Sequence, residues 1–231
     1  MITIIHGHDT AESRKKLREM ISFEEVDKDV EKISLDGKKL ELENLVMAAE
    51  SKSIVSDYKF VIIENLLQAK KSQNQENIIK YLLSFDSPFP LILWENSDID
   101  KRKLVKFKNK WRILQFNFPA KLFDFLDSVG KETPKKSVES FHSLLKEKPA
   151  EIIFTMLIRQ FRLLISVKEA QASDLGLPSW MYYKLKKQSA YFQADKLQLY
   201  YRKILNIEYQ IKKGLTPLSL SVLLDLFFLN I

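Results

Sequence analysis

The residues best suited to chemistry lie in two places, each directly after an apolar run of strand length. The first is segment 6–10, His-Gly-His-Asp-Thr, and the second is Glu64, after the run 58–63. A phosphate-binding loop at such a strand end needs Gly-x-x-x-x-Gly-Lys-Ser/Thr, because its backbone N–H groups must surround the phosphates. Segment 6–10 has one glycine and no lysine, and Asp9 would repel a phosphate. Nucleotide binding in the usual way is therefore not expected.

A metal-dependent enzyme is the alternative that these residues leave open. His6 and His8 stand two residues apart beside Asp9, and Glu64 lies where a carboxylate would ligate Mg²⁺. Without a phosphate loop, we expect the histidines to be surface or capping residues and Glu64 to be solvated. The sequence has no Gly-x-Ser-x-Gly elbow and no cysteine. We therefore expect no catalytic residues, no metal and no cofactor.

Two basic regions have the composition of nucleic-acid contacts. Stretch 101–112 has seven Lys and Arg and no acid, and its simpler interpretation is a solvated helix face with Leu104 and Phe107 directed inward. In segment 180–213, basic residues alternate with tyrosines and a tryptophan, which suits stacking on single strands. We expect most of these aromatic residues to lie in a helical core instead. The candidate DNA-contacting residues are Lys101, Arg102, Lys103, Lys184, Lys186 and Lys187.

Segment 51–57, Ser-Lys-Ser-Ile-Val-Ser-Asp, carries an apolar pair in polar surroundings just before the strongest predicted strand. Ile54 and Val55 could pack inward at a helix end. They could also be an exposed pair that enters a pocket of a partner protein. Periodicity leaves both possibilities open.

Composition indicates an ordinary globular chain with a basic second half. Of the 231 residues, 45% are hydrophobic and 29% charged, and the net charge is +7. Residues 1–118 contribute +1 and residues 119–231 contribute +6. This asymmetry is typical of proteins with an anionic partner, most often nucleic acid, or of a soluble basic surface. We expect neither a signal peptide nor a membrane span, and a cytoplasmic location.

Strand and helix signals alternate in the first half of the chain. The predicted strands are 2–5, 32–35, 58–63, 90–94 and 112–116, and the predicted helices are 11–20, 40–49, 75–85 and 100–107. Near-continuous apolar strands separated by helices are typical of a parallel sheet that is covered on both faces. We therefore expect an α/β domain over residues 1–118.

The second half contains only helical patterns. The predicted helices are 121–129, 135–146, 150–170, 179–191, 195–213 and 217–229, with prolines near their starts and glycines between them. We expect an all-α domain over residues 119–231.

Several segments, in order along the chain, resemble the bacterial DNA polymerase III delta subunit family. They are the strand and Gly-x-Asp turn at 4–9, the apolar pair before a strand at 52–63, the strand and Asp-Lys-Arg-Lys helix at 91–103, the Arg-Gln-Phe-Arg helix at 157–164, the Leu-Gly-x-Pro segment at 175–185, and the closing helix at 211–229. The resemblance covers nearly the whole chain.

The resemblance implies a degenerate AAA+ or RecA-like domain without a Walker A loop, followed by a helical collar domain. Members of this family are non-catalytic subunits of the clamp loader, which bind the ring-shaped sliding clamp and open it. The implied partners are that clamp, the ATPase and delta-prime-type loader subunits, and primer–template DNA, with direct contact to the DNA left open. The implied clamp-binding residues are Ser51, Lys52, Ser53, Ile54 and Val55, and the implied collar-packing residues are Arg159, Gln160, Phe161 and Arg162.

One feature departs from the family pattern. Members usually carry a small helical lid domain between the α/β domain and the collar, and this chain has no residues for one, because the collar-like pattern starts near 119–127. Two alternatives to a clamp-loader subunit stay open at this stage: a basic helical module that binds nucleic acid directly, and the metal-dependent enzyme considered above.

Overall fold

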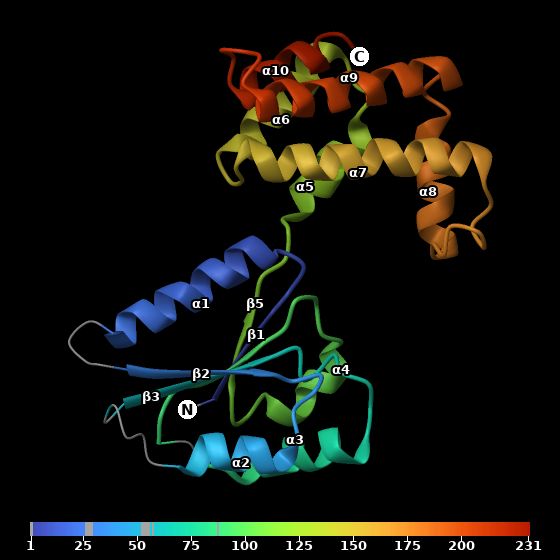
Figure 1. Ribbon diagram of the computed structural model, residues 1–231. Coiled ribbons are helices and arrows are strands. Elements are labelled where there is room, and N and C mark those ends of the chain that lie inside the picture. The colour runs from blue at the N-terminus through green and yellow to red at the C-terminus, as the bar shows by residue number, and fades with distance from the viewer. Residues whose placement is uncertain (1, 26–29, 52–55, 57, 87) are drawn as a thin grey trace. The chain divides into compact units, whose positions relative to one another are not determined.

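The computed structural model describes residues 2–25, 30–51, 56, 58–86 and 88–231. The chain divides into two compact units, Met1–Phe118 and Pro119–Ile231 (Figure 1). Within the described residues, every strand lies in the first unit and the second unit is helical. The expected order of an α/β half and an all-α half is confirmed. Among all the described residues of both units, no helix is long and apolar enough to cross a membrane.

The first unit is built on a parallel sheet of five strands in the order β2-β3-β4-β1-β5. The strands are β1 (Ile2–His6), β2 (Val30–Asp36), β3 (Tyr58–Glu64), β4 (Leu91–Trp94) and β5 (Arg112–Gln115). In the centre of the sheet, Ile4 is in register with Leu93 of β4 and with Ile113 of β5. Because all strands are parallel, their carboxyl ends meet at one edge, where ligand sites of α/β proteins usually lie.

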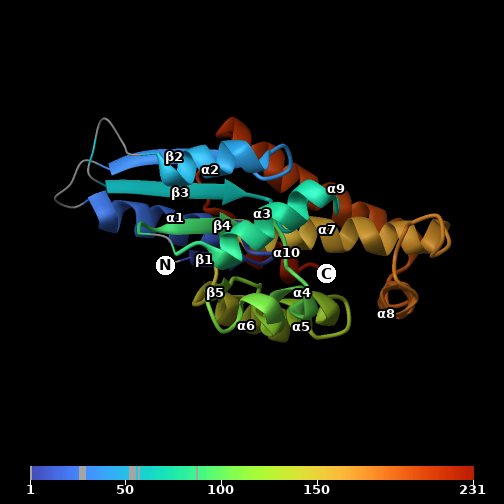
Figure 2. The same cartoon turned by 90° about the horizontal axis from the view of Figure 1, so that it is seen from below.

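Helices cover both faces of this sheet, which explains why the inner strands are mostly apolar on both sides. Helix α1 (Thr10–Glu25) lies on one face, and α2 (Leu42–Glu50) and α3 (Gln73–Ser84) lie on the other (Figures 1 and 2). The face that carries α2 and α3 also receives the short helix α4 (Lys101–Leu104) and the 3₁₀ turn η1 (Val105–Phe107). The sheet is thus the middle of three layers.

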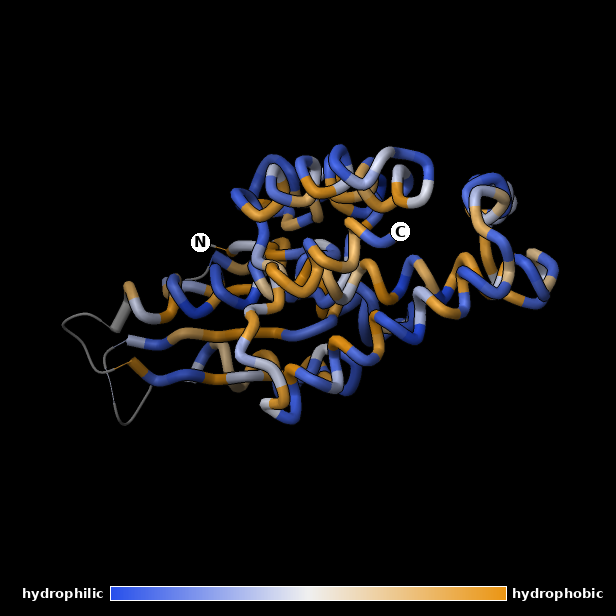
Figure 3. Tube along the Cα trace, turned by 90° about the horizontal axis from the view of Figure 1, so that it is seen from above, coloured by the Kyte–Doolittle hydropathy of each residue, from blue (hydrophilic) through white to orange (hydrophobic). Residues whose placement is uncertain are grey.

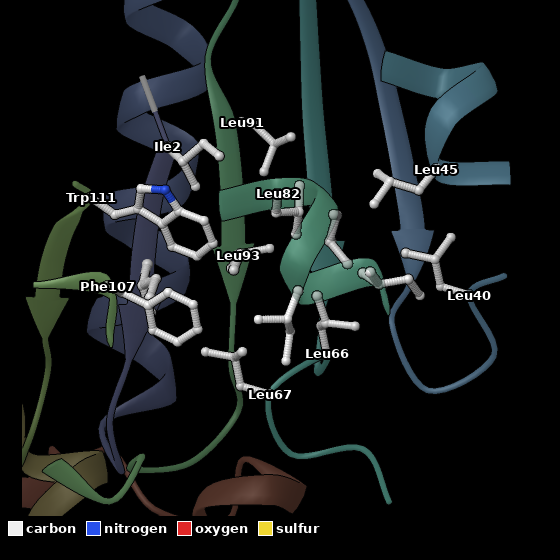
Figure 4. Close-up of a cluster of buried hydrophobic side chains, with 14 of the residues drawn as sticks. Ile2, Leu40, Leu45, Leu66, Leu67, Leu82, Leu91, Leu93, Phe107 and Trp111 are labelled. Carbon is white, nitrogen blue, oxygen red and sulfur yellow. The ribbon is translucent and has the colours of Figure 1, made fainter. Parts of the chain in front are cut away.

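The larger of the two cores fills the layer between the sheet and α2, α3 and α4 (Figure 4). Phe107 and Trp111 stack at 4.4 Å between ring centroids and close one end of this layer. Leu104 and Phe107 are buried, as expected for the inward face of the basic stretch. The basic side chains of that stretch are therefore left on the outside.

The second unit is a bundle of helices around α7. Its helices are α5 (Ala120–Ser128), α6 (Pro134–Leu145), α7 (Ala150–Glu169), α8 (Ser179–Ser189), α9 (Ala194–Lys213) and α10 (Leu220–Phe228). Phe161 of α7 is fully buried and packs against Phe192 at 6.0 Å and Phe227 at 5.8 Å. Gly214 ends α9 in the left-handed conformation that glycine adopts without strain. Apolar residues dominate α10, the helix that leads to the end marked C in Figure 3.

Candidate functional site

The loop between β1 and α1 is the place where an α/β domain would hold phosphate, and its backbone N–H groups are already engaged. Gly7 donates to Ser97 O at 3.2 Å, His8 donates to Asn117 Oδ1 at 2.9 Å, and Asp9 donates to Phe116 O at 2.9 Å. Gly7 is required here because a Cβ atom would lie 1.9 Å from the carbonyl oxygen of Phe116. The loop is therefore fastened to the neighbouring segments rather than shaped as a phosphate cradle.

The N-terminus of α1, where an anion would otherwise sit, is occupied by the protein itself. The Asp9 carboxylate is buried, and its Oδ1 accepts a hydrogen bond from the backbone N–H of Glu12 at 3.1 Å. This carboxylate satisfies one of the free N–H groups and complements the helix dipole. A phosphate at this position would have to displace a buried negative charge.

Glu64 is tied to α1, so the expectation of a solvated residue is wrong. The Arg14 guanidinium donates two hydrogen bonds of 2.7 Å to the two Glu64 carboxylate oxygens and lies 3.4 Å above the ring of Trp94. These hydrogen bonds hold the pKa of Glu64 below its usual value. A bidentate pair stacked on an aromatic ring fixes α1 to the ends of β3 and β4.

The two histidines differ, so a shared metal site is not formed. His6 is the last residue of β1 and is buried, which contradicts the expected surface or capping role. Its Nδ1 lies 2.9 Å from Asp98 Oδ1 and 3.2 Å from the backbone N of Ile99, and burial lowers its pKa. His8 is exposed. Across the residues that the structure describes, no group of three or more His, Asp and Glu side chains is arranged to hold a metal ion.

Glu95, directly after β4, is a buried carboxylate that organises the loop after β3. Its Oε1 accepts a hydrogen bond from the backbone N–H of Leu67 at 2.7 Å. The buried Gln75 amide donates to Leu66 O at 2.7 Å and Ala69 O at 3.3 Å, so two side chains hold the same loop. Burial raises the pKa of Glu95 to about 7, against the opposing effect of the loop N–H groups and Lys103.

Glu95 should make folding stability depend on pH. Its pKa is higher in the folded chain than in the unfolded chain, so the folded state binds more protons between about pH 4.5 and 7. The contribution of Glu95 to stability is therefore present below that range and is lost as the pH rises through it. We expect Glu95→Gln to flatten the fall in unfolding free energy across this range by on the order of 1–3 kcal/mol.

Urea titrations of the wild type and Glu95→Gln at several pH values measure this difference directly. Comparing the two proteins removes the contribution of Glu64 and Asp98, whose pKa values are shifted in the opposite direction. Parallel curves for the two proteins would show that Glu95 does not titrate in this range.

The structure describes only one residue of the predicted clamp-binding segment 51–55, namely Ser51. Lys52, Ser53, Ile54 and Val55 lie outside the described residues. Ser51 is exposed and caps the C-terminal end of α2. Its carbonyl oxygen and hydroxyl both accept hydrogen bonds from the ammonium of Lys59 in β3.

The basic residues of α4 are at the surface of the first unit. Lys101, Arg102 and Lys103 are exposed, and Arg102 donates to the Asp100 carboxylate at 2.9 Å. Asp100 also caps this helix through the N–H of Arg102 at 2.8 Å. One of the three cations is thus partly neutralised by its own helix cap, and the other two face solvent.

The aromatic residues of the second unit are less buried than we expected. Trp180, Tyr183 and Tyr191 are exposed, and Tyr182, Tyr200 and Tyr201 are half-buried, so the assignment of most of them to the core is wrong. For Trp180, Tyr182 and Tyr183 the reason is that α8 lies at one end of the bundle and packs mainly on α7, with only its Leu185, Gln188 and Ser189 side buried (Figure 1). Helical spacing cannot distinguish such a projecting helix from a central one.

The three candidate lysines of α8 have different surroundings. Lys184 forms an ion pair with Asp127, and the Lys186 ammonium donates to Val167 O at 2.8 Å. The ammonium of Lys187 has no hydrogen-bond or ion-pair partner in the described part of the chain. Only Lys187, together with Trp180 and Tyr183, is fully available on the exposed face of α8.

The four collar-packing candidates on α7 separate into two pairs. Gln160 and Phe161 are buried, and the Gln160 amide donates to Gln188 Oε1 at 2.6 Å, which fastens α8 to α7. Gln188 in turn donates to Leu126 O at 2.7 Å. Arg159 and Arg162 are exposed. The first pair thus packs inside its own unit, and the second pair is at the surface.

An apolar stripe runs along the exposed side of α10. It consists of Leu218, Val222, Leu226 and Leu229, each between 41% and 53% exposed. Val222 and Leu226 lie one helical turn apart on α10 and Leu229 is its C-cap, whereas Leu218 lies just before the N-cap Ser219. Exposed Leu205 and Tyr209 form a similar pair on α9. Apolar stripes of this kind are typical of surfaces that are covered in an assembly.

Comparison with known protein families finds models of the same subunit for both units. The family model "DNA polymerase III, delta subunit" matches residues 5–117, and the model "DNA polymerase III delta subunit, C-terminal domain" matches residues 120–231. No curated protein sequence matches the chain.

Two solved structures are similar to the chain. One is the Bacillus subtilis DNA clamp loader delta protein (YqeN), with 15% sequence identity over 99% of this chain and 94% of that chain, and a TM-score of 0.46. The other is a DNA polymerase III gamma subunit-related protein from Thermotoga maritima, with 13% identity over 99% and 92% and a TM-score of 0.37. Since delta-subunit family models match both units, the chain belongs to the DNA polymerase III delta subunit family.

Proposed function

We propose that this protein is the delta-type subunit of a DNA polymerase III clamp loader, acting in the cytoplasm. It binds the sliding clamp and opens it for loading onto primed DNA, and it does not hydrolyse ATP itself. The observation that carries this proposal is the match of delta-subunit family models to both units, at residues 5–117 and 120–231.

The loop after β1 supports the non-catalytic part of the proposal. Its three successive N–H groups are bonded to protein oxygens, and the buried Asp9 carboxylate caps α1. ATP hydrolysis requires an anion cradle at this position. ATP turnover in the assembled loader is then the task of neighbouring subunits.

Clamp binding is assigned to segment 51–55, which leads into β3. Ile54 and Val55 are proposed to enter a pocket on the clamp, with Ser51, Lys52 and Ser53 beside them. A small apolar anchor in a pocket supplies binding energy out of proportion to its size. A clamp that is bound more tightly when open is shifted towards the open state by that difference in affinity.

The helical unit is assigned to the collar, where it would pack against the ATPase and delta-prime-type subunits. The exposed apolar stripe of α10 and the exposed Arg159 and Arg162 of α7 support this assignment. The described chain passes from β5 to α5 within residues 116–119, so the proposed assembly relies on the α/β unit and the collar without a lid domain.

Direct contact with DNA is the second candidate function, and the exposed face of α8 favours it. Trp180 and Tyr183 are 69% and 70% exposed, and Lys187 lies one further turn along the helix. Aromatic rings can stack on unpaired bases while the ammonium contacts a phosphate. This face would serve either a basic module acting alone or a loader subunit that touches primer–template DNA.

Titration with the sliding clamp of the same organism tests the main proposal against this alternative. We expect a dissociation constant in the micromolar range or tighter, with binding that does not require DNA. A protein that fails to bind the clamp but binds single-stranded DNA with steep salt dependence would instead be a nucleic-acid module.

A further inference from the structure

A groove on the first unit is used by neither the clamp contact nor the collar contact proposed above. It is lined by the loop after β3 and the start of α3 on one side and by α4 and η1 on the other, and its volume is about 420 Å³. All of its lining residues are described. Arg102 and Lys103, which the sequence offered as DNA contacts, belong to this lining. The groove is therefore a candidate binding site of its own.

The floor of the groove is apolar and already packed. Three lining residues, Leu67, Ile79 and Phe107, form this groove floor, and each is at most 8% exposed because it belongs to the larger core of the unit (Figure 4). Val105 adds an apolar side chain that is 68% exposed. Apolar surface of this kind gains free energy when a partner removes it from water. A ligand that touched only the edge of the groove would leave that surface in water.

The wall formed by the loop after β3 is held in place from behind. Glu95 Oε1 accepts a hydrogen bond from the backbone N–H of Leu67 at 2.7 Å. Gln75, which itself lines the groove, donates to Leu66 O at 2.7 Å and to Ala69 O at 3.3 Å. Both of these side chains are buried. The groove is thus preformed, so little conformational entropy is lost when a ligand enters it.

Cations stand on both sides of the groove, and one acid, Glu76, lies among the lining residues. The cation on the loop side is Lys71, and those on the side of α4 and η1 are Arg102, Lys103 and Lys106. Arg102 is bound to Asp100, and the buried Glu95 attracts Lys103. Within the described residues, no hydrogen bond or ion pair engages the ammonium groups of the three groove lysines, all of which are exposed. The lining therefore carries a net positive charge that its own unit only partly offsets.

An acidic peptide with one apolar side chain matches both properties of the groove. The apolar side chain would fill the hollow, and carboxylates before and after it would reach the cations on the two sides. A volume of about 420 Å³ is typical of sites that enclose much of their ligand. Nucleic acid matches less well, because its phosphates would contact the cations and leave the apolar floor unfilled.

We propose that the groove lined by α3, α4 and η1 binds an acidic segment of a partner protein other than the sliding clamp. One apolar side chain of that segment packs on the groove floor, beside Val105, and acidic side chains on either side of it pair with the groove lysines. The inference does not depend on the proposed clamp contact, because segment 51–55 contributes no residue to the groove.

Peptides selected from a random displayed library on the full-length protein supply the probes for the test. Fluorescence anisotropy then measures the affinity of each enriched peptide for the wild type and for two variants. The groove variant, Lys103→Glu with Lys106→Glu, reverses two of the groove lysines. The control, Lys101→Glu with Lys108→Glu, reverses as many charges at exposed positions of the same basic stretch that do not line the groove. Thermal unfolding confirms that both variants are folded.

We expect the enriched peptides to carry acidic residues on both sides of one apolar residue. Their affinity should fall at least about tenfold in the groove variant and stay within about twofold of the wild type in the control. Replacing the apolar residue of such a peptide with alanine should also weaken binding about tenfold, because that side chain fills the hollow.

The inference is overturned if no selected peptide loses affinity in the groove variant. Titrations of the same proteins with single-stranded and duplex oligonucleotides test the other class of ligand. Oligonucleotide binding that falls in the groove variant, without any peptide that depends on the groove, would make this surface a nucleic-acid contact instead. No step of the test uses the sliding clamp, so these outcomes stand whether or not the proposed function holds.

Discussion

Replacing Ile54 and Val55 together with alanine will weaken binding of the sliding clamp by about 2–4 kcal/mol. This corresponds to a dissociation constant roughly 30 to 1,000 times larger. The physical reason is that two branched apolar side chains that fill a pocket are commonly the residues on which an interface depends, whereas polar residues around them contribute little. Surface plasmon resonance with immobilised clamp measures the difference directly.

The control for this experiment is Val105→Ala. Val105 is 68% exposed and belongs to the same α/β unit, but it lies on η1, far along the chain from the predicted segment. The control should bind the clamp as the wild type does. Equal affinity of the double variant and the wild type would remove the assignment of segment 51–55 as the clamp anchor, whatever the rest of the protein does.

Placing two carboxylates in the apolar stripe of α10 will prevent incorporation of the protein into the clamp loader. Val222→Asp with Leu226→Asp changes two residues that are 41% and 48% exposed, so the fold of the isolated unit should survive. In an assembled collar the same positions would be desolvated. An unpaired buried carboxylate costs several kcal/mol, and two of them should weaken assembly by at least about a hundredfold.

Gel filtration of a mixture with the ATPase and delta-prime-type subunits measures this effect. A variant with Gln171→Asp and Gln193→Asp adds the same two charges at exposed polar positions of the same unit and should assemble normally. The isolated stripe variant should also bind the clamp with wild-type affinity, because the stripe and segment 51–55 belong to different units. Normal assembly of the stripe variant would mean that the collar contacts use another surface.

The order of strands and helices was largely predictable, because each prediction depended on the spacing of apolar residues along a short stretch of sequence. Residues 60–63 are apolar without alternation because helices cover both faces of β3, and this pattern is visible in the sequence. Segment 100–107 was predicted as one helix, whereas the structure has α4 followed by the 3₁₀ turn η1. Leu104 and Phe107 are three residues apart, a spacing that brings side chains to one face in either kind of helix.

The side-chain partners around the candidate site were harder to predict, because they come from residues far apart in the sequence. Nothing near Glu64 in the sequence indicates Arg14, which is fifty positions away and meets it only when α1 packs on the sheet. Glu95 and Lys59 were also missed. A charged residue inside or directly after a strongly apolar strand was the available signal, since such a residue must find partners when it is buried.

The lysines that close helix ends also affect how the protein would respond to salt. In the described part of the chain, the ammonium groups of Lys59, Lys110, Lys168 and Lys186 donate to backbone carbonyl oxygens within their own units. An ammonium that already donates to a carbonyl oxygen has fewer donors left for a phosphate, so the net charge of +7 overstates the number of phosphates that the protein can contact closely. If the proposed contact with primer–template DNA exists, we therefore expect it to be weaker than the net charge suggests.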